Sequence, residues 1–146
     1  MNRPTVTDDM VYEACLSVAH KLDGADDDRQ IETMARSIAR VYRHPMDGFC
    51  LAKELDRREF WDTSREEADE LDAIEMMVSR SLHAAEKDWF EANAIQPPLP
   101  VGAMTTRGVI AGIYEHKPAY YLVKENGCTQ DGRHLLIKFE DAREAA

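Results

Sequence analysis

The chain lacks the features by which several classes of protein are recognised. Its apolar runs are only a few residues long within 146 residues, whereas about twenty consecutive apolar residues are needed to span a bilayer. The first residues, MNRPTVTDDM, contain no apolar stretch of the kind found in signal peptides. We therefore expect a protein that does not enter membranes and that works in the cytoplasm.

Cysteine is scarce and is not arranged for a shared role. The three cysteines are Cys15, Cys50 and Cys128, and no two of them form a C-x-x-C pair. An odd number without such pairs is typical of a reducing compartment rather than of a disulfide scaffold. The five histidines are equally scattered, with no H-E-x-x-H motif and no adjoining cysteine. We expect neither a metal site nor a cofactor.

Recognisable catalytic motifs are also missing. The chain contains no G-x-S-x-G motif, no P-loop and no G-x-G-x-x-G motif. Cys128 lies in a polar loop, and a nucleophilic thiol needs a base beside it, for which His116 and His134 are the nearest candidates. An isolated loop cysteine is more often an exposed thiol. We predict that the protein is not an enzyme.

Positive charge is in short supply. The chain has 18 Lys and Arg against 28 Asp and Glu, a formal net charge of −10. Residues 99–146 contain six of each sign, so the whole acidic excess lies in residues 1–98. A field of this sign repels nucleic acid and anionic membranes and attracts basic protein surfaces. Solubility alone would also account for it.

The acidic part of the chain has a helical pattern. Apolar residues recur at spacings of three and four over about 7–22, 27–43, 47–58 and 64–93. Asp26-Asp27-Asp28 lacks the spacing of a calcium loop, so we interpret it as a helix cap. Ser64 and Glu67 form a capping box. Three or four helices are predicted to pack around an apolar seam on the last segment: Leu71, Ile74, Val78, Leu82, Ala85, Trp89 and Ala92. In the third segment the apolar positions are Phe49, Leu51, Ala52 and Leu55.

After residue 94 the construction changes. Three prolines make residues 95–100 an extended linker, and short β-patterned runs follow at 101–105, 108–115, 119–125 and 134–140. Gly108 and Gly112 within one run indicate bulges or bends. We predict an α+β fold with an acidic helical part (1–94), the linker, and a small antiparallel β module (101–146). The module either closes into an SH3-like barrel or lies as a sheet on the long helix.

Eight carboxylates gather around the start of the longest predicted helix, and Arg65 is the only cation among them. They are Glu59, Asp62, Glu66, Glu67, Asp69, Glu70, Asp72 and Glu75. Acids are favoured at helix N-termini in any case, because of the helix dipole. Alternatively, the cluster imitates the charge spacing of a nucleic-acid backbone and occupies a basic groove on a partner protein. These eight residues are the candidate partner-binding site.

The β module offers a second set of candidates. Tyrosine suits recognition because it combines apolar area with a polar tip, and Tyr114, Tyr120 and Arg133 are the secondary binding candidates. At least two of the four module aromatics Tyr114, Tyr120, Tyr121 and Phe139 are expected in the core. An alternative function is nucleic-acid binding through Lys117, Lys124, Arg133 and Lys138. Another is a sponge for a small nucleotide signal, which needs a homo-oligomer with a polar pocket between subunits.

Three stretches carry a resemblance to known proteins: Met46-Asp-Gly-Phe-Cys-Leu-Ala-Lys-Glu-Leu55, Ile95-Gln-Pro-Pro-Leu-Pro-Val-Gly102, and Gly108 to Asp141 with its ending Leu135-Leu-Ile-Lys-Phe-Glu-Asp141. They resemble small phage and prophage proteins that pair a helical part with a β-rich part. The resemblance implies a phage-encoded accessory protein acting in the bacterial host cytoplasm. Small acidic proteins of this kind often disable a host machine, so it further implies an anti-defence inhibitor of the anti-CRISPR type.

Overall fold

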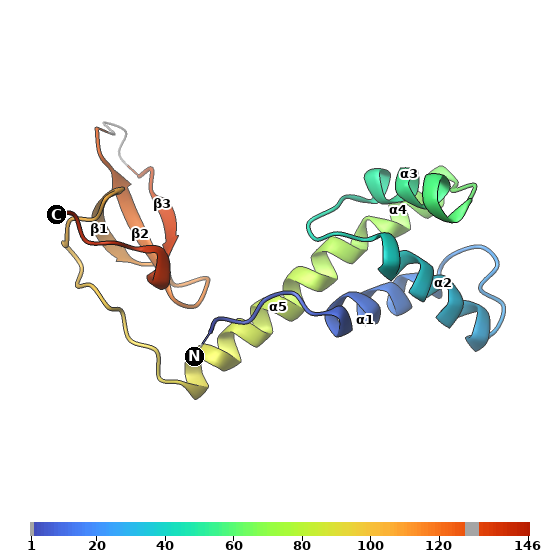
Figure 1. Ribbon diagram of the computed structural model, residues 1–146, viewed down its shortest axis with the longest axis horizontal. Helices are drawn as coiled ribbons and strands as arrows, with labels where there is room; N and C mark the ends of the chain where they lie inside the picture. The colour runs from blue at the N-terminus through green and yellow to red at the C-terminus, as the bar shows by residue number, and fades with distance from the viewer. Residues whose placement is uncertain (1, 128–131) are drawn as a thin grey trace. The chain divides into compact units, whose positions relative to one another are not determined.

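The computed structural model describes residues 2–127 and 132–146. Within these ranges the chain forms five α-helices, then a three-stranded antiparallel sheet and a 3-10 turn (Figure 1). The predicted α+β fold, with helices first and a small β module after them, is confirmed. No helix in the described ranges is long and apolar enough to cross a membrane.

The chain divides into two compact units. Pro4–Ala84 form one, here called the helical unit, and Met1–Arg3 with Ala85–Ala146 form the other, here called the β unit. Each unit has its own cluster of buried apolar side chains. The units are described separately below.

The helices of the helical unit begin where the sequence supplies a capping side chain. Each cap accepts a hydrogen bond from a backbone N–H of the first turn, which would otherwise lack a partner. At two helices a glutamine or glutamate reaches back to complete a capping box. The caps are Thr7 for α1 (Asp8–Ala19), Asp27 for α2 (Asp28–Val41), Asp47 for α3 (Gly48–Glu59) and Ser64 for α4 (Arg65–Leu71). The interpretation of the Asp26–Asp28 run as a helix cap, rather than a calcium loop, is confirmed.

The core of the helical unit follows from the helical spacing of its apolar residues. Ile31, Ala35 and Ile38 recur along one face of α2 and are buried. Leu51 and Leu55 of α3 are fully buried in the same cluster. The burial of each of these isoleucine and leucine side chains stabilises the fold by roughly 1.5–3 kcal/mol.

The helix predicted over 64–93 is interrupted at Asp72. It forms α4 and then α5 (Ala73–Ala92). The Asp72 carboxylate accepts a hydrogen bond of 2.8 Å from the backbone N–H of Gly48, so it is tied to the start of α3. The apolar seam predicted on this helix also differs from the prediction, because its residues pack in two separate cores. Ile74 and Val78 are buried in the helical core, whereas Trp89 packs against the buried cluster of the β unit.

The sheet of the β unit has the order β1-β2-β3, with both pairs antiparallel. Its strands are β1 (Gly108–Ile113), β2 (Tyr120–Glu125) and β3 (Leu135–Lys138). The register of β1 on β2 shifts between Ile110 and Gly112, which confirms an irregularity at the second glycine. The last predicted run is a strand only as far as Lys138, and a 3-10 turn over Phe139–Asp141 follows it.

The predicted strand at 101–105 is wrong. These residues belong to no named strand. They are joined to the rest of the β unit by two isolated bridges, Met104 with Val109 and Thr105 with Glu144, and by backbone hydrogen bonds to Ile110 and Ala145. A tight turn separates them from β1, and in it the Thr105 hydroxyl donates to the carbonyl of Gly108 and accepts from that residue's N–H. An SH3-like closure of the module stays a prediction.

Tyr121 organises the core of the β unit. Its side chain is fully buried, with its ring centroid 4.4 Å from that of Phe139, so two of the four module aromatics are core residues as expected. Its hydroxyl donates to the Leu99 carbonyl at 2.9 Å and accepts from the Leu99 N–H at 2.8 Å. Ile95 and Leu99, which belong to the predicted linker, also pack against this core.

Candidate functional site

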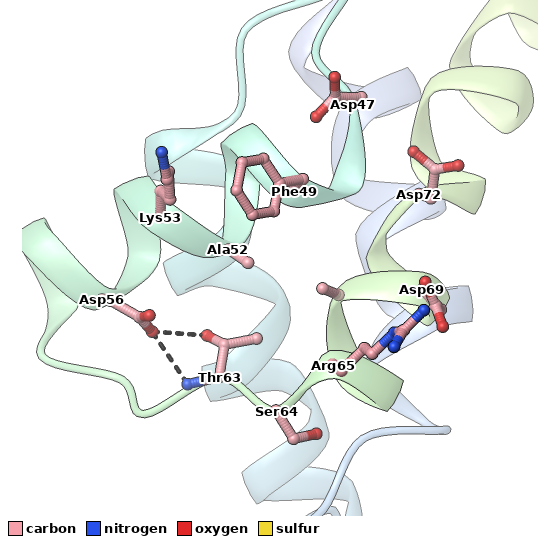
Figure 2. Close-up of a pocket in the computed structure, with 11 residues that line it drawn as sticks. Asp47, Phe49, Ala52, Lys53, Asp56, Thr63, Ser64, Arg65, Asp69 and Asp72 are labelled. Atoms are coloured by element: carbon pink, nitrogen blue, oxygen red, sulfur yellow. Dashed lines mark hydrogen bonds between the residues drawn. The ribbon is translucent and has the colours of Figure 1, made fainter.

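An open hollow of about 650 Å³ lies beside α3 and α4 in the helical unit (Figure 2). Its lining contains four carboxylates and two cations, so acidic groups are in excess. Apolar atoms of Phe49, Ala52 and Ala68 complete it. The charged and polar lining consists of Asp47, Lys53, Asp56, Thr63, Ser64, Arg65, Asp69 and Asp72.

Both ends of this hollow are fixed by the fold. At one end a Cβ on Gly48 would lie 2.2 Å from the Ala68 carbonyl oxygen, so only glycine lets α3 approach α4 this closely. At the other end the Asp56 carboxylate accepts from the Thr63 N–H at 2.9 Å and from its hydroxyl at 2.7 Å (Figure 2). These contacts tie α3 to α4 and to the segment that precedes α4.

Phe49 is exposed at the hollow. Its side chain is 64% exposed, and the Lys53 ammonium lies 4.7 Å from the centre of its ring. The sequence placed Phe49 with Leu51 and Leu55 on the apolar side of the third helix. The structure buries those two leucines but leaves Phe49 in solvent. An exposed aromatic ring beside carboxylates is the kind of group that binds a partner.

Phe60 is a second exposed aromatic residue, which the sequence did not single out. It ends α3 in the left-handed conformation, with φ of 58°, and its side chain is 90% exposed. Glycine usually occupies this position, and another residue there costs about 1–2 kcal/mol. Strain of this kind concentrates at functional sites. The available signal was a phenylalanine at a helix end, four residues before the Ser64 capping box.

The structure does not bring the eight predicted carboxylates onto one free surface. Four of them have partners within the helical unit: Glu59 with Arg40 at 2.9 Å, Glu67 in the Ser64 capping box, Glu70 with Lys21 at 3.8 Å, and Asp72 with the Gly48 N–H. The hydrogen bond from Arg40 holds the pKa of the Glu59 carboxyl below its usual range.

The other four carboxylates differ in exposure. Asp62, Glu66 and Asp69 are exposed, whereas Glu75 is half-buried. The cluster also borders two hollows. Asp69 and Asp72 line the larger one, while Asp62 and Glu67 line a second hollow of about 350 Å³, and Thr63 lines both.

The described cysteines are not activated for nucleophilic chemistry. Burial raises the pKa of the Cys15 thiol to about 12. The hydrogen bond to the Asp47 carboxylate and its negative charge raise the pKa of the exposed Cys50 thiol. Cys128, the thiol singled out by the sequence, lies outside the described residues. Within the described ranges, no group of three or more His, Cys, Asp and Glu side chains is placed to hold a metal ion.

The secondary candidates in the β unit occupy different surroundings. Tyr114 packs edge-on against His116, with ring centroids 5.3 Å apart. The Tyr120 ring is covered by the guanidinium of Arg3, 4.9 Å from its centroid. Arg133 is exposed in the connection that precedes β3. The Tyr120 ring is therefore already engaged within the chain.

No family model matches the chain, and searches of curated proteins and of solved structures found no match.

Proposed function

We propose that this protein acts without catalysis, as a binding protein that occupies a basic and partly apolar surface of a partner protein. The contact is made by the α3–α4 surface, meaning the lining of the larger hollow together with Phe60, Asp62 and Glu66, which adjoin that lining in sequence. The observation that carries the proposal is the exposed Phe49 ring at a preformed hollow with four carboxylates.

The free energies of typical contacts give the acidic and the aromatic side chains different roles in binding. An exposed ion pair contributes roughly 0–1 kcal/mol, so Glu66 and Asp69 supply little affinity one by one. A cluster of acids instead raises the association rate by an order of magnitude or more at low salt. Truncation of a buried aromatic anchor typically costs about 2 kcal/mol or more of binding free energy. Phe49 and Phe60 would thus hold the partner that the acids attract.

The resemblance to small phage proteins suggests the kind of partner and the cell compartment for this proposal. In it, the partner is part of a host protein complex in the bacterial cytoplasm, and occupation of its basic surface inhibits it, as an anti-defence protein would. A basic surface that normally holds nucleic acid fits this role, since carboxylates then stand in for phosphates. Direct binding of nucleic acid by this chain is opposed by its net charge of −10.

Affinity capture from a bacterial lysate, with captured proteins quantified for wild type and variants, tests the proposal. The charge variant is Glu66→Lys with Asp69→Lys, because both side chains are exposed and neither acts as a helix cap. The anchor variant is Phe49→Ala. We expect a partner retained by wild type to associate more slowly with the charge variant and to dissociate faster from the anchor variant.

A matched control carries the same change in net charge elsewhere on the helical unit. Glu13→Lys with Asp26→Lys serves, since both residues are exposed and line neither hollow. Capture by this control should equal that of wild type. A partner that binds all folded variants at the wild-type rate in low salt would show that the α3–α4 surface is not the contact.

A further inference from the structure

The guanidinium of Arg3 is enclosed in a site built by the β unit. The Arg3 side chain is 7% exposed. Its Nε lies 2.6 Å from the Glu140 carboxylate, and Nη2 lies 3.1 Å from the second oxygen of the same group, which is the forked pairing that arginine makes and lysine does not. A second carboxylate, from Glu86, is 3.6 Å from Nη1.

Aromatic rings and backbone carbonyls complete this enclosure. The guanidinium carbon lies 5.1 Å from the Trp89 ring and 4.9 Å from the Tyr120 ring, both within range of a cation–π interaction. The carbonyls of Pro118 and Ala119 accept from Nη1 at 3.0 Å and Nη2 at 2.8 Å. We call these residues, without Arg3, the guanidinium site.

Two features distinguish the site from an ordinary surface ion pair. Ala119 adopts the left-handed conformation with φ of 58°, a strained state for a residue with a Cβ, and its carbonyl is one of the two acceptors. The indole N–H of Trp89 is buried and has no hydrogen-bond acceptor among the described residues. One ring of the site thus carries an unsatisfied buried donor, and one of its carbonyls is held by a strained backbone.

Arg3 is held there by its side chain rather than by its backbone. Among the described residues, no backbone hydrogen bond joins residues 2–6 to another part of the backbone. Two carboxylates, from Glu86 and Glu140, face this single guanidinium. An occupant attached in this way is exchangeable, because its departure breaks no strand or helix.

We propose that the guanidinium site is a binding site for an arginine side chain of another protein, and that Arg3 occupies it in the absence of that protein. The site lies on the β unit, so this proposal does not depend on the α3–α4 surface. Arg3 acts as a competitor in cis. A short tether gives such a competitor an effective concentration in the millimolar range, so only an arginine presented with further contacts displaces it.

The test uses the full-length Arg3→Ala variant, with N-acetyl-arginine amide as the probe and N-acetyl-lysine amide as its control. We expect the arginine probe to raise the melting temperature of this variant by about 3–5 °C at ten times its Kd. The lysine probe should have less than half this effect, because it lacks the fork. Wild type should bind the arginine probe at least about tenfold more weakly than the variant does.

A second change separates site binding from a general effect of arginine on the solvent. Arg3→Ala combined with Glu140→Gln removes the forked acceptor and should abolish the response to the probe. If Arg3→Ala alone is unfolded, the probe should restore its circular dichroism signal, again in preference to the lysine amide. Equal responses to the two probes, equal affinities of wild type and variant, or no response in either assay would overturn the proposal.

Discussion

Phe60 ends α3 with a left-handed backbone and with almost its whole ring in solvent. The ring is 90% exposed, so it contributes little to the core, while the backbone conformation opposes folding. A residue of this kind persists when something other than stability selects it. Partner binding is the reason we propose, and it predicts that stability and binding respond to substitution in opposite directions.

Phe60→Gly is the substitution that separates them. Glycine adopts φ of about 58° without steric cost, so the free energy of unfolding should rise by about 1 kcal/mol. Urea unfolding measures this gain. Phe60→Ala is the matched control, because it removes the ring but keeps the strained Cβ. Both variants should release a captured partner faster than wild type. A glycine variant less stable than the alanine variant would refute the strain argument.

Cys50 allows a second prediction at the level of one residue, because the Asp47 carboxylate raises the pKa of its thiol. A raised pKa means less thiolate at pH 8, and therefore slow alkylation. Asp47→Asn removes the charge and keeps a good N-cap for α3, so the alkylation rate of Cys50 should increase. Mass spectrometric mapping of iodoacetamide adducts distinguishes Cys50 from the buried Cys15. The same rate in both proteins would contradict the prediction.

At the scale of elements, local signals could be predicted from the sequence and contacts between elements could not. The helix cap at Asp26–Asp28 and the capping box at Ser64 were visible because all their parts lie within four residues. The break at Asp72 had no local signal, and the hydrogen bond that Asp72 accepts there comes from Gly48, 24 residues earlier. The run at 101–105 has strand composition. It meets β1 across the tight turn at Thr105 through one isolated bridge and a few backbone hydrogen bonds, and it forms no regular strand.

Gly108 in β1 is another position where a neighbouring element determines which residue type fits. Its φ is 150°, and a Cβ there would lie 2.0 Å from the Lys124 carbonyl oxygen on β2. Gly108→Ala should therefore lower the free energy of unfolding of the β unit by about 2 kcal/mol or more. Gly112→Ala in the same strand is the control, since no atom lies within 4 Å of its Cβ position. Similar losses from both substitutions, measured by urea unfolding, would show that the close approach is unimportant.

At the scale of the whole molecule, the charge totals predicted that the surface is negatively charged, but not which carboxylates are paired with cations. Glu59 and Glu70 are paired with cations 19 and 49 positions away in sequence, which no local pattern indicates. Phe49 was predicted to lie on the apolar side of its helix for a related reason. Helical spacing marks apolar residues as core, and only packing shows which of them the core leaves out.

The contact between Arg3 and Glu140 joins residues 137 positions apart, and it should make stability depend on pH. The hydrogen bond from Arg3 holds the Glu140 pKa below its usual range. A carboxyl with a lowered folded-state pKa stabilises the fold above its unfolded pKa of about 4.3, and this stabilisation is lost as pH falls through the folded-state value.

Glu140→Gln should therefore be less stable than wild type at pH 7, and the difference should shrink below about pH 4.3. Urea unfolding between pH 3 and 7 measures it. Glu115→Gln, at an exposed position in the same unit, controls for the change in net charge and should show no such trend. A difference that stays constant with pH would mean that the Glu140 charge contributes nothing.

The two tryptophans allow the stability of the two units to be measured separately. Trp61 packs against the buried cluster of the helical unit and Trp89 against that of the β unit, and these clusters share no buried residue in the described ranges. Trp89→Phe and Trp61→Phe each leave one fluorescent reporter. Gly108→Ala, placed in both backgrounds, should lower the urea midpoint reported by Trp89 and shift the one reported by Trp61 far less. The reason is that the clash with Lys124 lies wholly within the β unit. Equal shifts at both tryptophans would show that the two cores unfold as one cooperative unit.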